Sequence, residues 1–475
     1  MRASTPFAIT ALFLASACTE PTNMAARPTV SLATVAASAS AAPTGRHIVA
    51  FTAAIPSDFA SRVASLGGTV LWISNETGLA TVSGLSAANA DNLAASKGVQ
   101  SVDADQAFAL DLPSSLSAPD ADGVSPASPS DPTTAVRYAR QWNMRAVHAD
   151  AAWAAGHLGS SSVHVYMLDS GIDYLHADLI GLVDLNTSVD LLGTFDVGGV
   201  PFTEADTVQK YFPGRLPFTD LFFHGTHTGA TVSSNAIRAA GITSHTTLVA
   251  VKVCAYLDIC PFSSILDGVI YAVLNGGDVI NLSLGGAFEK AHNGRFVGLL
   301  NKVFNFARSR GVTVVVSAGN SAADLDHDGN TYWTFCNNPA VMCVSATGPT
   351  AEASVNGPWT DVDAPAYYTN FGSSAISVAA PGGNNVTFVW AACSQTSLLI
   401  DCSSLPIFIL GAQGTSMAAP HVSGTAALLV AQIGRNPAQI KAQIQQTADD
   451  LGKPGVDDFY GKGRLNVGRA TGALP

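Results

Sequence analysis

Apolar and polar positions follow one another in short blocks between residues 46 and 107, and these blocks predict six elements. The segments HIVAF, TVLWI, LATVSG and VQSVDADQ have the apolar runs of strands, while SDFASRVASLG and SAANADNLAAS have the spacing of helices. Ser57 or Asp58 is expected to open the first helix and Ser86 the second, because these residue types cap helix N-termini. The β-α-β-β-α-β order predicts a small α+β, ferredoxin-like unit.

Longer apolar strands alternate with helices from about Ala135 to the end of the chain. Five runs end in glycine or small polar residues: SVHVYMLDSG, TLVAVKV, DVINLSLGG, GVTVVVSAGN and AVMCVSATG. SSILDGVIYAVLNGG and VGLLNKVFNFARSRG are predicted to be amphipathic helices closed by glycine. Continuous apolar strands are buried on both faces, so we predict an α/β domain, a mostly parallel sheet with helices on both faces. Functional residues are then expected beyond the carboxyl ends of the strands.

The remaining segments differ in composition from these two units. Residues 1–17, MRASTPFAITALFLASA, have the pattern of an export signal peptide, with an apolar core too short to span a bilayer. Cys18 either follows an ordinary cleavage site or is a lipid-attachment cysteine, which would be the only membrane tether. Residues 18–45 are rich in Ala, Thr, Ser and Pro and are expected to be a flexible leader. Residues 108–134 are expected to be an exposed linker that contains the maturation cleavage.

Composition narrows the range of partners and suggests disulfides. The 475 residues include 35 acidic and 23 basic side chains, a formal net charge of −12, and Lys and Arg do not cluster. This balance argues against nucleic acid as a partner. Besides Cys18 there are six cysteines, an even number that suggests disulfides in an exported protein. Of the 15 possible pairings, the close spacing of neighbours favours three local ones: Cys254–Cys260, Cys336–Cys343 and Cys393–Cys402.

Three residues near predicted element ends could form an activated nucleophile. Asp169 ends the strand VHVYML, His227 lies in the small-residue stretch HGTHTGATV, and Ser416 lies in GTSMAAPHVSG, where a long apolar run begins. An aspartate would orient the histidine, which would take a proton from the attacking serine. Each residue alone is more often a turn, core or cap residue, but the joint pattern favours catalysis. Ser416 is also expected to open a buried helix, whose N-terminus would favour a developing negative charge.

The motifs DSGID, HGTHTG and GTSMAAPH, in this order, resemble those of the subtilisin-like serine proteases, the subtilase family. NLSLGG, SAGN, NFG, AAPGG and YGKGRLN extend the resemblance over about residues 140–472, and residues 46–107 resemble the family's inhibitory propeptide. One departure follows the histidine motif, where Thr228-Gly229-Ala230 replaces the more usual Val-Ala-Gly. We expect this departure to alter helix packing and not to abolish catalysis.

The resemblance implies an exported serine endopeptidase that cleaves protein or peptide substrates through an acyl-enzyme and is made as an autoinhibited proenzyme. Asn320 would stabilise the oxyanion together with the Ser416 backbone N–H. The extended substrate would bind as an added strand. Its cleft would be formed by Ser283, Leu284, Gly285, Gly286, Ala318 and Gly319. Residues 46–107 would inhibit the catalytic domain, residues 135–475, which is expected to be a monomer that needs no cofactor for its chemistry.

Two interpretations remain open for the acidic segment ADLDHDGNTYW. Asp324, Asp326, Asp328 and Gly329 match the first half of a calcium-binding loop, but Phe335 stands where a complete loop has glutamate. A hard cation would relieve the repulsion among three close carboxylates. A structural calcium site is therefore one prediction, and an acidic surface turn is the other.

Two other function classes are compatible with the same fold. A catalytically silent binding protein is disfavoured because Asp169, His227, Ser416 and Asn320 are all present. A serine hydrolase acting on esters is disfavoured because Ser416 is not in a G-x-S-x-G elbow.

Overall fold

The computed structural model describes residues 43–108, 116–117, 128–333, 335–405 and 408–475. The expected signal peptide, Cys18, the leader up to residue 42 and most of the expected linker lie outside these ranges. Among the residues that the structure describes, no helix combines the length and the apolar character that crossing a membrane requires.

The N-terminal unit has the predicted β-α-β-β-α-β order. Its elements are β1 (Pro43–Phe51), α2 (Phe59–Ser65), β2 (Thr69–Ser74), β3 (Leu79–Ser83), α3 (Ala87–Ala94) and β4 (Val99–Phe108). The strands pair antiparallel in the order β4-β1-β3-β2, and both helices contribute to one small core. Ser86 accepts a hydrogen bond from the Asn89 N–H and caps α3 as predicted. Asp58 precedes α2, but its carboxylate pairs with Arg62 and makes no capping bond.

The larger, C-terminal part of the chain is built on a seven-stranded sheet, whose strands pair in parallel. The strand order is β19 (Val378–Pro381), β16 (Val341–Thr347), β14 (Thr313–Ser317), β12 (Val279–Leu282), β6 (His164–Asp169), β10 (Thr247–Lys252) and β7 (Val189–Asp190). The five predicted strands are its central members. The two edge strands are short and were not predicted.

Alternate side chains of each central strand enter two separate cores, because successive residues of a strand point to opposite faces. On β6, Tyr166 and Leu168 join the core beneath α8 (Phe262–Leu274) and α9 (Lys290–Ser309). Val165 and Met167 join the core of the opposite face. That face is covered by α7 (His224–Val232), α10 (Thr415–Ile433) and α11 (Pro437–Thr447). The predicted α/β fold with helices on both faces is thus confirmed.

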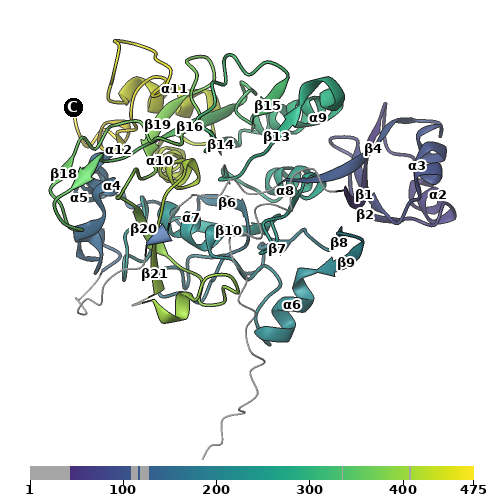
Figure 1. The fold of residues 1–475 in the computed structure, drawn as a ribbon, viewed down its shortest axis with the longest axis horizontal. Coiled ribbons are helices and arrows are strands. Elements are labelled where there is room, and N and C mark those ends of the chain that lie inside the picture. Colours follow the sequence, from purple (N-terminus) through teal and green to yellow (C-terminus); the bar gives the residue numbers. More distant parts are fainter. Residues whose placement is uncertain (1–42, 109–115, 118–127, 334, 406–407) are drawn as a thin grey trace, which may run out of the picture.

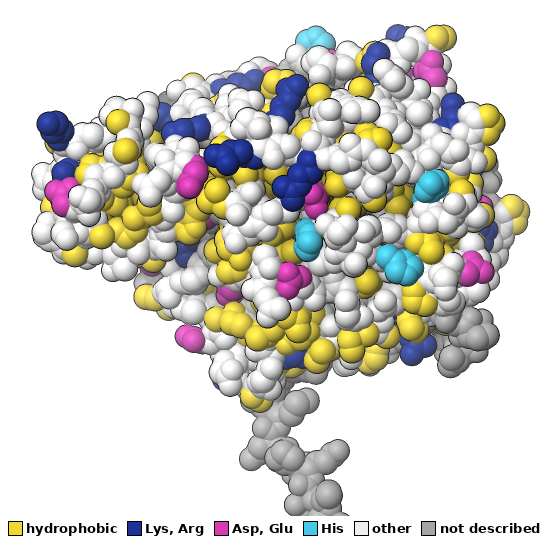
Figure 2. Space-filling view, turned by 180° about the vertical axis from the view of Figure 1, so that it is seen from behind, with side chains coloured by type: hydrophobic (Ala, Val, Ile, Leu, Met, Phe, Trp, Pro, Cys, Tyr) yellow, Lys and Arg dark blue, Asp and Glu magenta, His cyan; other side chains and the backbone are white. Residues whose placement is uncertain are grey.

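The N-terminal unit joins the C-terminal part through its last strand. The short strand β11 (Cys260–Pro261) pairs antiparallel with the end of β4 and adds a fifth strand to the sheet of the unit. Figure 1 shows the unit, in purple, at one end of the molecule beside α8. From behind it forms a protruding lobe with hydrophobic side chains on its surface (Figure 2). Leu71 and Ile73 of β2 are among its exposed apolar residues.

Candidate active site

Asp169 and His224 form a buried pair at the carboxyl edge of the sheet. Asp169 is the last residue of β6 and His224 the first residue of α7. His224 Nδ1 lies 2.8 Å from Asp169 Oδ1. Because a carboxylate can only accept, Nδ1 must carry the proton, and the neutral ring presents Nε2 as an acceptor. Within the described residues, this buried Nε2 has no hydrogen-bond partner.

The prediction that His227 pairs with Asp169 is wrong. His227 lies three residues further along α7, and its Nε2 is 3.2 Å from the carbonyl oxygens of both Val389 and Leu410. Its imidazole therefore donates to the ribbon of β20 (Val389–Ala392) and β21 (Ile409–Ala412). Of the two histidines, only His224, the first residue of α7, contacts the aspartate at the end of β6. The signal that could have identified His224 is its place at the start of the helix, directly at the carboxyl edge of the sheet.

The surroundings shift the pKa values of the two histidines in opposite directions. Burial alone would lower the pKa of His224, but the charge and hydrogen bond of Asp169 outweigh it, together with the charges of Asp220 and Asp258. The pKa of His224 is therefore raised above its ordinary value of 6.5. Burial, and then the proximity of His224, lower the pKa of His227 to about 3. His224 is suited to accept a proton at neutral pH, whereas His227 stays neutral.

Asp220 fixes the loop before α7 through several hydrogen bonds. The sequence did not indicate this role. This buried carboxylate accepts from Ser170 Oγ (2.9 Å), from the Phe222 N–H (2.9 Å), and from both the N–H and Oγ1 of Thr226 (3.0 and 2.6 Å). Burial raises its pKa to about 6. It thereby connects the residue after Asp169 with the first turn of α7. An aspartate four residues before a histidine gave no recognisable signal in a single sequence.

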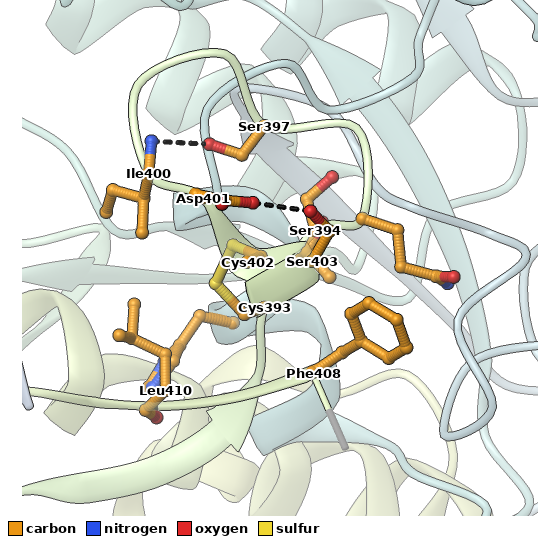
Figure 3. Close-up of a disulfide and its surroundings, with 12 residues drawn as sticks. Cys393, Ser394, Ser397, Ile400, Asp401, Cys402, Ser403, Phe408 and Leu410 are labelled. Carbon is orange, nitrogen blue, oxygen red and sulfur yellow. Dashed lines mark hydrogen bonds between the residues drawn. A yellow bond between two sulfur atoms is a disulfide. The ribbon is translucent and has the colours of Figure 1, made fainter. Parts of the chain in front are cut away.

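A loop closed by a disulfide contacts the segment around Asp220. The Cys393–Cys402 bridge links the two ends of a loop between β20 and β21, in which Ser397 and Asp401 make local hydrogen bonds (Figure 3). Ser394 Oγ of this loop donates to the Asp220 carbonyl oxygen at 2.6 Å. The loop therefore contributes to the position of the segment that leads into His224.

All three disulfides favoured by the spacing are present. Their sulfur atoms are 2.04, 1.98 and 1.98 Å apart in Cys254–Cys260, Cys336–Cys343 and Cys393–Cys402. Each closes a loop of 6, 7 or 9 residues, so each holds a local segment.

Ser416 is buried in the first turn of α10, as predicted, but it is not the cap. The helix begins at Thr415, after Gly414, whose φ of 149° lies at the edge of the left-handed region. Ser416 Oγ donates to the Ser283 carbonyl oxygen at 3.0 Å, and Ser283 Oγ donates to the Ser416 carbonyl oxygen at 2.8 Å. These reciprocal bonds tie the start of α10 to the segment that follows β12.

Asn320 supplies the missing cap. Its Oδ1 accepts from the Thr415 N–H at 2.8 Å and from Thr415 Oγ1 at 2.9 Å. Thr415 Oγ1 in turn accepts from the Gly319 N–H at 3.0 Å. Asn320, Gly319 and the helix start are thus held together one residue from Ser416. Because Oδ1 accepts both bonds from Thr415, the orientation of the Asn320 amide is fixed, and its donor group is Nδ2.

The predicted cleft residues lie after two adjacent parallel strands, β12 and β14. Ser283, Leu284, Gly285 and Gly286 follow β12, and Ala318 and Gly319 follow β14. A Cβ atom on Gly286 would lie only 2.4 Å from Cδ1 of Phe108, so the glycine is required for close approach of that ring. Phe108, the last residue of β4, also packs with Phe262 and Phe288 at ring-centroid distances of 5.5 and 5.8 Å. The N-terminal unit therefore ends against the predicted substrate-binding segment.

The next described segment of the chain pairs with the strand that leads into Ser416. The short strand β5 (Leu116–Ser117) pairs antiparallel with β21, with Leu116 opposite Ala412. β21 ends four residues before Ser416. The described segments before and after residues 109–115 thus lie against Gly286 and against β21.

The acidic loop does not bring its carboxylates together. Each of the three aspartates has a different partner: Asp324 contacts His327 (2.8 Å), Asp326 accepts from the Ser374 N–H (3.1 Å), and Asp328 contacts Lys290 (2.5 Å). No group of three or more His, Cys, Asp or Glu side chains in the described ranges could hold a metal ion. This arrangement does not fit a calcium site. Calcium binding stays a prediction, and no step below depends on it.

Comparison with known proteins identifies the family of this chain. A sequence model of the subtilase family (peptidase S8) matches residues 160–463. A thermophilic serine proteinase from Bacillus sp. (strain AK1) is 31% identical over 329 residues, which cover 69% of this chain and 65% of that protein. Thermitase from Thermoactinomyces vulgaris is 29% identical over 347 residues, 72% of this chain and 99% of that protein.

A solved structure shares the fold. The epidermin leader peptide processing serine protease from Staphylococcus aureus superposes with a TM-score of 0.67 at 19% identity, over 90% of this chain and 98% of that chain. The chain belongs to the subtilase family, a family of serine endopeptidases.

Proposed function

We propose that this chain is an exported endopeptidase that hydrolyses peptide bonds through Asp169, His224 and Ser416. The observation that carries the proposal is the His224 ring. Its Nδ1 is held by Asp169, while its buried Nε2 has no partner among the described residues. A ring held in this tautomer can accept a proton only at Nε2.

The reaction follows from these groups. His224 Nε2 takes the proton of Ser416 Oγ as the oxygen attacks the substrate carbonyl carbon. The imidazolium, stabilised by Asp169, then gives this proton to the leaving amine, and an acyl-enzyme forms on Ser416. Water attacks the ester in the same way and releases the acid. In the structure the hydroxyl of Ser416 donates to Ser283 O, so its rotation toward His224 belongs to the first step.

Negative charge on the substrate oxygen develops at the N-terminus of α10. We propose that Asn320 Nδ2 and the Ser416 backbone N–H donate to this oxygen, since Thr415 fixes the Asn320 amide through Oδ1. Donors held in advance stabilise the transition state more than the ground state, because the charge appears only as the reaction proceeds. No metal or other cofactor is needed for these steps.

We further propose that the N-terminal unit inhibits the enzyme until the chain is cut. Its interface with the catalytic part is buried and polar. Asp105 of β4 accepts from the N–H and Oγ of Ser263 at 2.9 and 2.7 Å and so caps α8 from the neighbouring unit. Arg46 donates to Ser264 Oγ at 3.0 Å, and Thr81 Oγ1 donates to Asp267 at 2.9 Å. Such contacts support a specific docked state.

The pairing of β4 with β11 and of β5 with β21 supports a cleavage point. The chain leaves the unit at Phe108, beside the predicted cleft, and reappears at Leu116 beside β21, which leads into Ser416. We propose that the maturation cleavage lies between Phe108 and Leu116, near the start of the expected linker. The three disulfides favour an extracytoplasmic location. Lipid attachment at Cys18 and a monomeric state stay predictions.

Two assays test this function. The secreted wild-type protein should hydrolyse casein and leave a neutral lipid ester intact, and Ser416→Ala should lose the casein activity. Intact mass and N-terminal sequencing should show that the wild-type active species starts between residues 109 and 116, whereas Ser416→Ala keeps the N-terminal unit covalently attached. Ester hydrolysis without casein hydrolysis would overturn the proposed activity. An active species that starts before residue 46 would overturn the proposed inhibition.

A further inference from the structure

Asp169 is held at both of its oxygens by α7. His224 contacts Oδ1, and Thr228 Oγ1 lies 3.1 Å from Oδ2. The two residues are four apart in the helix, so their side chains lie on the same face one turn apart. Ser170 N–H adds a 2.7 Å bond to Oδ1, and Thr228 is itself fully buried.

Thr228 is the residue at which this chain departs from the usual motif. A valine in this position has nearly the same shape as threonine but no hydroxyl, so it could fill the same space without contacting the carboxylate. The departure was expected to change helix packing. The structure shows that Thr228 also makes a polar contact with Asp169, which was not predicted.

We propose that Thr228 is a positioning residue for the reaction, which orients Asp169 through Oδ2 so that Oδ1 faces His224. The inference rests on the proposed function of Asp169 and His224. The competing role for a helical threonine is donation to a carbonyl oxygen one turn back, and Thr228 Oγ1 lies 3.3 Å from Gly225 O. A hydroxyl has one proton. The shorter distance and the charge of the carboxylate favour Asp169 as its acceptor.

The hydroxyl has a predictable effect on the histidine. Its bond to Oδ2 draws negative charge away from Oδ1 and therefore weakens the support that Asp169 gives to the imidazolium. Loss of the hydroxyl should raise the pKa of His224 and move the acid limb of kcat/KM to higher pH. The less constrained carboxylate should also lower kcat and leave KM unchanged, because Thr228 does not touch the substrate.

The test compares Thr228→Val, which keeps the shape, with Thr228→Ser, which keeps the hydroxyl. Both are measured with a peptide substrate from pH 5 to 10, and their melting temperatures are recorded. Thr228→Val should have a kcat about 3- to 10-fold lower, as expected for the typical net contribution of one hydrogen bond, with its acid limb at higher pH. Thr228→Ser should stay within about twofold of wild type.

The proposal fails if Thr228→Val matches the wild-type kcat and pH profile. It also fails if Thr228→Ser loses as much activity as Thr228→Val, which would assign the effect to the methyl group. The downfield proton resonance of His224 Nδ1 provides a second readout, which should move in Thr228→Val and not in Thr228→Ser. Failure of the proposed function is distinguishable, because the wild type itself would then show no peptide hydrolysis that depends on Ser416.

Discussion

Asp267→Asn should stabilise the proenzyme, by an amount that grows with pH. Asp267 lies on α8 at the interface with the N-terminal unit, where it accepts from Thr81 Oγ1, and only 8% of its surface is exposed. Burial raises its pKa to about 8; the charge of Asp105 adds to this effect and the charge of Arg46 opposes it. The docked state therefore keeps this carboxyl protonated at neutral pH.

The sign and the size of this effect on stability follow from proton linkage. Unfolding returns the pKa of Asp267 from about 8 to its ordinary 3.8, so the folded protein binds the extra proton between these values. Stability then falls as pH rises from about 4 to 8 and levels off above. At about 1.4 kcal/mol per pH unit, the separation sets an upper limit of about 6 kcal/mol. Asparagine has no charge to bury and can still accept from Thr81, so Asp267→Asn should remove this loss of stability at higher pH.

Thermal unfolding of Ser416→Ala and of Ser416→Ala/Asp267→Asn measures the effect on uncut chains. The melting temperatures should coincide near pH 4, and the double variant should melt at a progressively higher temperature up to pH 8. Asp91→Asn, at an exposed position of α3, is the matched control and should show no such trend. A gain that is equal at pH 4 and pH 8, or no gain at pH 8, would show that Asp267 is not protonated in the docked state. The same linkage implies that release of the N-terminal unit becomes easier as pH rises.

Three other substitutions separate the roles of the buried groups in and around α7. His224→Ala should lower kcat by about 10⁴- to 10⁶-fold. His227→Ala should keep most of the kcat and lower the free energy of unfolding by about 1–3 kcal/mol, because two carbonyl groups lose their donor. Kinetics and thermal melting check both variants, and the opposite pattern would identify His227 as the base. Asp220→Asn removes a charge that raises the pKa of His224, so the acid limb of kcat/KM should move to lower pH; an unchanged or higher limb would contradict the electrostatic role of Asp220.

The fold and the position of Ser416 were predictable because they depend on periodicity. Continuous apolar strands with intervening amphipathic helices occur in few architectures, and a strand-end aspartate marks the edge where chemistry is found. The order of elements in the N-terminal unit followed from the same patterns. The local disulfides followed from the spacing of the cysteines.

The choice between His224 and His227 was not predictable in this way. Both stand in HGTHTG among the same small residues, and the one that meets Asp169 is decided by the residue at which α7 begins. The contacts of Thr228 and Asp220 were hidden for a similar reason, because they depend on side chains brought together by tertiary packing. The acidic loop has the spacing of a calcium loop, yet Asp324 pairs with His327 of the same loop, and Asp326 and Asp328 pair with groups from other segments.

The nucleophile itself offers the most direct measurement. Wild type, Ser416→Ala, His224→Ala and His227→Ala are each cleaved in trans by a trace of wild-type enzyme that is then removed. A fluorophosphonate probe is added, and the modified residue is located by mass spectrometry. The proposed mechanism predicts one adduct, on Ser416, whose formation is abolished in Ser416→Ala, strongly slowed in His224→Ala and retained in His227→Ala. An adduct on another residue, or a rate of labelling that depends on His227 and not on His224, would contradict it.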